Sequence, residues 1–213
     1  REPIMTADFE MLLEALKREN KHGLRAICVL SGVYGIRISE IAGMKIKNGI
    51  VEITTLKQNE KTMNEEPHTR IVQPLNLPNL PKLGEEIIAD LESRKITFPD
   101  PIKRALEKSN DDDGYKLVGE RFGKLINRFW FWKELKTKYS NLVPYAFRHS
   151  YAWRGSMETV PAVPYRVLAD LLGHDLDTHL KYYGKWSNDQ ENKKRIEEAN
   201  KNILDKYALA STK

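Results

Sequence analysis

One short stretch of this chain carries β-strand signals, whereas the rest has the apolar spacing of amphipathic helices. Residues 50–55 follow the turn dipeptide Asn48-Gly49, and residues 69–74 are typical of a strand that returns beside them. The polar residues 57–68 between the two are too many for a tight turn, and we expect a loop there. The expected fold class is therefore mainly α with a small antiparallel β sheet (α+β), with the hairpin at about 50–75.

Apolar residues recur at helical spacing through most of the remaining sequence. Thr6 is the candidate N-cap of the first helix, and Gly35 ends the second. The last helix, at about 188–207, is highly charged and has a narrow apolar stripe, which suits packing on a neighbouring molecule as well as on its own core. Between these, helices are expected at residues 24–34, 38–44, 82–95, 101–108, 118–138, 145–157 and 165–172.

Composition limits the partner and the compartment. The net charge of +5 and the pI near 9.1 favour a polyanionic partner. The single cysteine, Cys28, excludes a disulfide framework within the chain and a cysteine-rich zinc motif. Because no apolar run reaches about 18 residues, no membrane-spanning helix and no membrane partner are expected, and a cytoplasmic location fits.

Short motifs place two arginines, a histidine and a tyrosine in a fixed order along the chain. Arg37 lies in a Gly-Ile-Arg-Ile-Ser-Glu segment, Arg148 follows Tyr145 in a Tyr-Ala-Phe-Arg-His segment, His174 ends a Leu-Gly-His segment, and Tyr183 comes nine residues later. This set suits the attack of a phenolic oxygen on a phosphodiester. Arginine forks match the non-bridging phosphate oxygens and supply stabilisation that a metal would otherwise give. A tyrosine with a pKa of about 10 needs a positive field or a base for its activation.

Each of these residues also has an ordinary structural explanation. Arg37 is three residues from Glu40 and would form a helical ion pair with it. Arg148 lies in an apolar helix and would need a buried carboxylate as its partner. His174 follows a helix stop and would cap that helix by interacting with its dipole.

Two further choices stay open on the residues alone. Either Tyr182 or Tyr183 is available as the nucleophile, and aromatic packing is the alternative for both. His179 lies five residues after His174, whereas a zinc-binding pair on a helix is more naturally four apart, so a metal site is weakly supported and none is expected.

A lysine on the hairpin loop would deliver the proton that the departing alkoxide needs. Lys57, at the end of the first strand, is the first choice, and Lys61 is the second. A loop can close over bound DNA and bring such a lysine to the phosphate. The alternative is a solvated loop lysine.

Taken together, these motifs resemble the catalytic signature of the tyrosine recombinases, the phage-integrase family. The resemblance runs from Thr6 to the tail helix, and the segment at 178–186 is similar to a variant in cyanobacterial integrase-like recombinases. It implies that residues 1–213 form a single catalytic domain and that the N-terminal core-binding domain is missing from this fragment. The usual distance between the family's histidine and its tyrosine is nine residues, which favours Tyr183 as the nucleophile.

The resemblance also implies roles and partners. Arg37 and Arg148 would clamp the phosphate, His174 would assist, and Lys57 would protonate the leaving oxygen. The family usually has His-x-x-Arg-His, where this chain has Tyr145; a neutral phenol can donate one hydrogen bond to a phosphate, but it cannot act as an imidazole base at neutral pH.

The implied activity is site-specific DNA recombination through a 3′-phosphotyrosyl intermediate, without metal or other cofactor, in the bacterial cytoplasm. Double-stranded DNA is the expected partner, with self-association into a tetrameric synapse through the tail helix. Two alternatives remain: a type IB topoisomerase that relaxes DNA, and a DNA-binding regulator that has lost catalysis, for which the tyrosine at position 145 is the main support.

Overall fold

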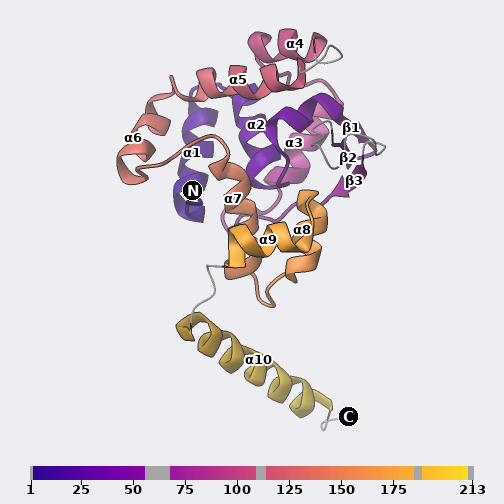
Figure 1. Cartoon of the computed structure of the whole chain (residues 1–213), viewed down its shortest axis with the longest axis vertical. Helices are drawn as coiled ribbons and strands as arrows, with labels where there is room; N and C mark the ends of the chain where they lie inside the picture. Colours follow the sequence, from indigo (N-terminus) through magenta and orange to yellow (C-terminus); the bar gives the residue numbers. More distant parts are fainter. Residues whose placement is uncertain (1, 56–67, 109–113, 185–188, 211–213) are drawn as a thin grey trace.

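The computed structural model describes residues 2–55, 68–108, 114–184 and 189–210, and the chain in these ranges is mostly helical (Figure 1). The preferred proton donor, Lys57, and its alternative, Lys61, lie outside the described residues. The α-helices are α1 (Thr6–Arg18), α2 (His22–Gly32), α3 (Leu83–Glu92), α4 (Asp100–Glu107), α5 (Gly114–Ile126), α6 (Trp130–Lys138), α7 (Ala146–Trp153), α8 (Tyr165–Leu172), α9 (Leu176–Tyr183) and α10 (Asp189–Ala210).

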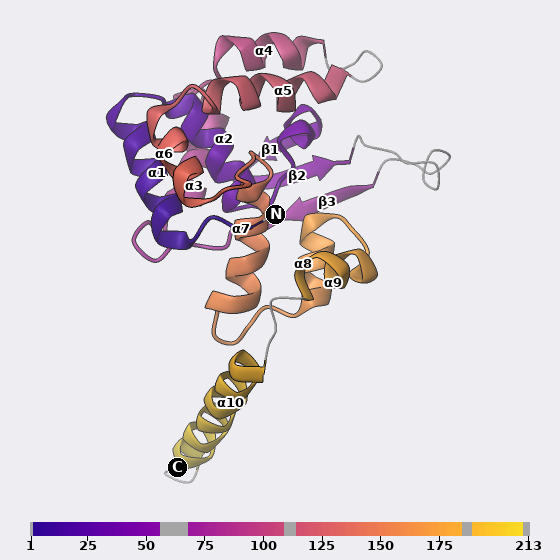
Figure 2. The same ribbon diagram turned by 60° about the vertical axis from the view of Figure 1, so that its left-hand side comes forward.

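Three antiparallel strands form one small sheet in the order β1-β2-β3 at one side of the helical body (Figure 2). They are β1 (Met44–Lys47), β2 (Ile50–Thr54) and β3 (Thr69–Val72). The expected hairpin is β2 and β3, whereas β1 was not predicted, and its first residue, Met44, was expected to end a short helix over 38–44. A 3₁₀ turn (Ile38–Gly43) ends there instead, and Asn48-Gly49 then joins β1 to β2.

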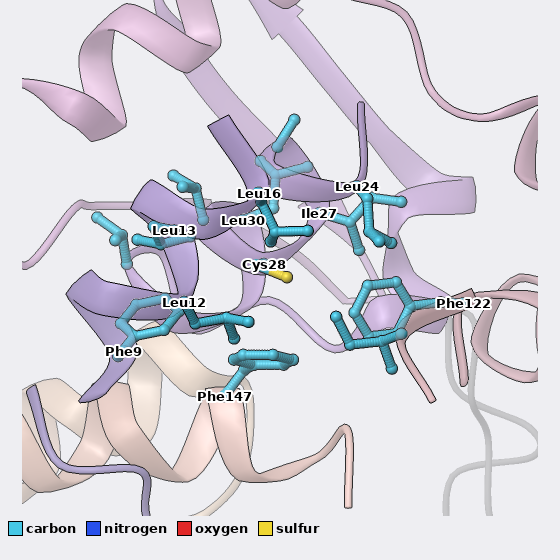
Figure 3. Close-up of a cluster of buried hydrophobic side chains, with 14 of the residues drawn as sticks. Phe9, Leu12, Leu13, Leu16, Leu24, Ile27, Cys28, Leu30, Phe122 and Phe147 are labelled. Atoms are coloured by element: carbon cyan, nitrogen blue, oxygen red, sulfur yellow. The ribbon is translucent and has the colours of Figure 1, made fainter. Parts of the chain in front are cut away.

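The core is built mainly by α1 and α2, whose apolar faces pack against each other and against α5 and α7 (Figure 3). Phe147 of α7 reaches into this core, with its ring centroid 5.1 Å from that of Trp132, 5.6 Å from Phe9 and 6.0 Å from Phe122. Packing on several sides fixes the rotation of α7 about its axis. The opposite face of this helix is thereby held in one orientation.

Three helix boundaries differ from the sequence prediction. The region expected as one helix over 118–138 is interrupted between α5 and α6, where the backbone of Phe129 is extended and the indole of Trp132 donates to Asn127 Oδ1 at 3.0 Å. The cap of α1 is Met5, whose side chain makes no capping bond, and Thr6 instead donates its hydroxyl proton to Glu158. The helix predicted over 145–157 ends as α7, and a π-helical turn (Arg154–Glu158) follows it.

The tail helix α10 projects away from the rest of the chain in both views (Figures 1 and 2). Arg195 donates to the backbone carbonyl of Ser156 and so ties α10 to the π-helical turn. The apolar side chains of Ile196, Ile203 and Leu204 are more than half exposed. No helix among the described residues is long and apolar enough to cross a bilayer.

Candidate active site

Helix α7 presents three functional side chains away from the core that anchors Phe147. Tyr145, at its N-cap, and His149 are four residues apart and so lie on one face, where their rings meet edge to face with centroids 4.9 Å apart. Arg148 lies between this face and the core and is fully buried. A single helix therefore supplies a guanidinium, a phenol and an imidazole to one place.

The guanidinium of Arg148 is held between the ends of two helices. Its Nη1 donates to the carbonyl of Gly35 at 2.5 Å, just beyond α2, and its Nη2 donates to the carbonyl of Leu172, the last residue of α8. Gly35 has a φ of +70°, and a Cβ there would lie 2.8 Å from the ring of Tyr151. The carbonyl of Leu172 belongs to the negative end of α8, which attracts a cation. Burial first, and then the charge of Arg37, lower the pKa of Arg148 from its ordinary value.

The carboxylate of Glu40 lies among three arginines. Arg37 donates to its Oε1 at 2.6 Å, Arg70 donates to its Oε2 at 2.8 Å, and Nη1 of Arg148 is 3.7 Å from Oε2. Burial would raise the pKa of Glu40, but Arg148, Arg37 and Arg70 outweigh it and lower that pKa to about 2. The pairing of Arg37 with Glu40 that the sequence offered as an ordinary explanation is present, and it does not remove Arg37 from the cluster.

Arg70 reaches this cluster from the buried face of the sheet, where it pairs across from Ile53. Its Nε donates to the carbonyl of Leu171 at 2.9 Å, and its Nη1 donates to Thr55 Oγ1 at 2.9 Å. Gly173 has a φ of +65°, and a Cβ at this glycine would lie 2.6 Å from Arg70 Nη1. The glycine is therefore required both by the left-handed turn after α8 and by the close approach of Arg70.

Tyr145 faces the two arginines of the motifs. Burial would raise the pKa of its phenol, but the charges of Arg148 and Arg37, with hydrogen bonds from both groups, outweigh burial and lower that pKa. The charge of Arg148 also contributes to lowering the pKa of His174 and of His179. Tyr145 is thus part of the cationic cluster in the place where the family pattern has a histidine.

Tyr183, the last residue of α9, is buried against the same cluster. Its hydroxyl lies 3.1 Å from Nδ1 of His149, and its ring centroid lies 4.7 Å from that of His179 and 6.0 Å from that of His174. Burial raises the pKa of the Tyr183 phenol to about 12, although the charge of Arg148 opposes this. Tyr182, by contrast, is 55% exposed.

His174 and His179 form a hydrogen-bonded pair, with 3.0 Å between Nε2 of the first and Nδ1 of the second. Burial and then Arg148 lower the pKa of His174 to about 3 and that of His179 to about 4. Both imidazoles are therefore neutral near neutral pH. Within the described residues, no group of three or more histidine, cysteine, aspartate or glutamate side chains is placed to hold a metal ion.

The fold thus gathers five of the predicted site residues from three distant regions of the sequence: Arg37, Tyr145, Arg148, His174 and Tyr183. The sequence interpretation did not assign roles to Arg70 or to the contact of His149 with Tyr183. Arg70 shares the buried face of β3 with Val72, but the adjacent apolar residues Ile71 and Val72 leave that face undecided in the sequence. The contact of His149 arises only from tertiary packing, and no local pattern indicates it.

Comparison with known proteins supports the fold. The crystal structure of XerA recombinase matches 91% of this chain and 63% of that chain, with a TM-score of 0.53 and 17% sequence identity. This chain therefore spans less than two thirds of the length of the protein it resembles. No family model and no curated protein matches the sequence. The expected fold class, mainly α with a small antiparallel sheet and similar to a tyrosine recombinase catalytic domain, is confirmed.

Proposed function

We propose that this chain is the catalytic domain of a tyrosine recombinase, and that it cuts and rejoins double-stranded DNA at specific sites. Tyr183 attacks the scissile phosphate and forms a 3′-phosphotyrosyl bond. Arg37 and Arg148 bind the non-bridging oxygens, and Tyr145 and His174 each donate a hydrogen bond to the phosphate. The bond energy is conserved in the phosphotyrosyl link, so no nucleotide is consumed.

The observation that carries this proposal is a buried excess of positive charge beside a buried tyrosine hydroxyl. Three guanidinium groups and one carboxylate leave the cluster with a net charge of +2, and neutral His174 adds nothing to it. A buried net charge is costly unless an ion of opposite sign compensates it. A phosphodiester supplies that ion, and its charge grows on the non-bridging oxygens in the transition state, where fixed donors stabilise it most.

The acid of this reaction is proposed to be Lys57, with Lys61 as the alternative. In the sequence, both lysines lie between β2, which ends at Thr54, and β3, which begins at Thr69. The leaving 5′ oxygen becomes an alkoxide unless it receives a proton, and a lysine is a suitable donor.

The tail helix α10 is proposed to dock on a neighbouring protomer and so to assemble a tetramer on DNA. Its apolar stripe is exposed at Ile196, Ile203 and Leu204, so the described part of its own chain does not cover it. Deletion of the residues after Asn188 is expected to weaken assembly on DNA while leaving the core folded. Complexes of unchanged size on native gels would contradict this role.

A second candidate is a DNA-binding regulator without catalytic activity, and Tyr145 is the residue that favours it. The family histidine can exchange a proton near neutral pH, whereas a phenol bound by two guanidinium groups serves as a donor. Under this alternative the arginine cluster would bind phosphate, and Tyr183 would have only a packing role.

Covalent trapping tests the two candidates. The protein is incubated with nicked suicide duplexes tiled from the DNA that flanks its gene, without divalent metal, and the products are separated on denaturing gels. We expect a protein–DNA adduct from the wild type and from Tyr182→Phe, but none from Tyr183→Phe. DNA binding without any adduct would favour the regulator. If the protein forms the adduct and also relaxes plasmids that lack a recombination site, a type IB topoisomerase would be favoured.

A further inference from the structure

His149 contacts the proposed nucleophile directly, although none of the roles above uses it. Its Nδ1 lies 3.1 Å from Tyr183 Oη, and the two residues are only 7% and 2% exposed. We propose that His149 is the general base that takes the phenolic proton of Tyr183 during attack on phosphorus. This inference rests on the proposed function and assigns a residue that the sequence motifs left without a role.

The direction of the hydrogen bond follows from the chemistry of the two groups. The pKa of Tyr183 is raised to about 12, mainly by burial, so the phenol keeps its proton at neutral pH. A neutral phenol in contact with an imidazole nitrogen donates when that nitrogen carries the lone pair. A protonated phenol is a weak nucleophile, and attack requires a group within hydrogen-bond reach that accepts the proton.

The surroundings favour His149 over the other groups of the site. Tyr145 is bonded to the guanidinium groups of Arg37 and Arg148, which hold its oxygen as part of the phosphate-binding cluster. Nε2 of His174 is already 3.0 Å from His179 Nδ1. The charged and titratable groups that act on the phenol of Tyr183 or contact the pair include Arg37, Tyr145, Arg148, His174, His179 and Tyr182.

Helix α7 holds the imidazole in a fixed position. The ring of Tyr145 packs edge-on against His149 with an interplanar angle of 75°, and the ring of Tyr183 packs against it at 67° with 5.4 Å between centroids. A base fixed in this way needs no rearrangement before it accepts a proton, and preorganisation of this kind lowers the barrier.

The step balances in atoms and electrons. The O–H bond of Tyr183 breaks and its proton passes to Nδ1 of His149, while the phenolic oxygen forms a bond to phosphorus. The bond between phosphorus and the 5′ oxygen breaks, and that oxygen takes a proton from the acid. His149 becomes an imidazolium, whose charge the phosphate offsets, and it returns the proton to Tyr183 when the DNA is rejoined.

The test separates a base from a residue that only positions Tyr183. His149→Asn retains an amide oxygen near the position of Nδ1 that can accept the hydrogen bond but not the proton, and His149→Ala removes both functions. We expect both variants to bind DNA normally and to form the adduct about 10²-fold more slowly or worse. His22→Asn, which changes an exposed histidine on α2, is the matched control and is expected to react at the wild-type rate.

A modified substrate distinguishes the base from the acid. With sulfur in place of the bridging 5′ oxygen, the leaving thiolate needs no proton, so a defect in the acid is rescued and a defect in the base is not. We therefore expect His149→Asn to stay slow on this substrate. Rescue by sulfur, or adduct formation by His149→Asn at the wild-type rate, would overturn the role of His149 as a base.

Nitrogen NMR of the wild-type imidazole gives a readout that needs neither DNA nor a substitution at His149. We expect His149 to carry its proton on Nε2, with an Nδ1 resonance that shifts in Tyr183→Phe. A proton on Nδ1 would make His149 the donor and overturn the proposal. Wild-type protein that forms no adduct on any substrate would instead refute the proposed function, and the base role with it.

Discussion

Replacing Glu40 by glutamine tests how the arginine cluster is held together. The carboxylate of Glu40 is 2% exposed and accepts hydrogen bonds from Arg37 and Arg70, with Arg148 also within 4.0 Å. Its pKa falls from 4.5 to about 2 in the folded protein. At about 1.4 kcal/mol for each pKa unit, the ionised carboxylate favours the folded state by roughly 3 kcal/mol. Removing one partner of a buried ion pair typically costs about 3–5 kcal/mol, which agrees.

Urea unfolding at several pH values measures this contribution. Because the folded-state pKa lies below the ordinary value, the stabilisation is complete above pH 4.5 and is lost as the pH falls towards 2. We expect Glu40→Gln to be less stable than the wild type by about 3 kcal/mol at pH 7, with a difference that shrinks below pH 4.5. Glu197→Gln, on exposed α10, is the matched control and should cost less than about 0.5 kcal/mol. A Glu40→Gln variant as stable as this control at pH 7 would refute the electrostatic account.

Other substitutions test the packing around the site. Gly173→Ala should lose at least ~1 kcal/mol more stability in urea than Gly49→Ala: both glycines have positive φ, but a Cβ at Gly173 would collide with Arg70, whereas none of the described atoms lies within 4 Å of a Cβ at Gly49. Equal losses would show that Arg70 moves aside freely. Cys28 is fully buried and its burial raises the pKa of the thiol, so a thiol reagent should modify it only as fast as the protein unfolds; rapid labelling of the native protein would contradict the core packing.

The sequence motifs named most of the residues that the fold brings together, because each motif lies where a helix starts or ends. Arg37 follows the turn at Gly35, and His174 follows the turn at Gly173, which are both positions with positive φ that the sequence marks with glycine. Arg148 was recognisable because a charged residue within an apolar helix needs a partner. The partner is an assembly of carbonyls and Glu40, and this follows only from how the helices pack.

The features that the sequence did not predict depend on register and tertiary contact. Ile71 and Val72 are adjacent apolar residues, so alternation alone does not decide which of them is buried; the structure buries Val72, and Arg70 with it. The strand β1 has only four residues, and the 3₁₀ turn before it places Ile41 in the core as a helix would. Short elements such as these are set by packing more than by local preference.

Arg70 explains how the site keeps an excess of positive charge without losing its fold. Its guanidinium donates to both oxygens of Glu40, to Thr55 and to the carbonyl of Leu171, so its donors are used within the protein. Glu40 is thereby shared, and its single negative charge does not neutralise Arg37 and Arg148 as well. The side chain of Arg37 is 20% exposed, against 5% for Arg70, so Arg37 is more open to an incoming phosphate than Arg70 is. A second carboxylate would stabilise the cluster further, but it would neutralise positive charge that the proposed reaction needs in order to bind the phosphodiester.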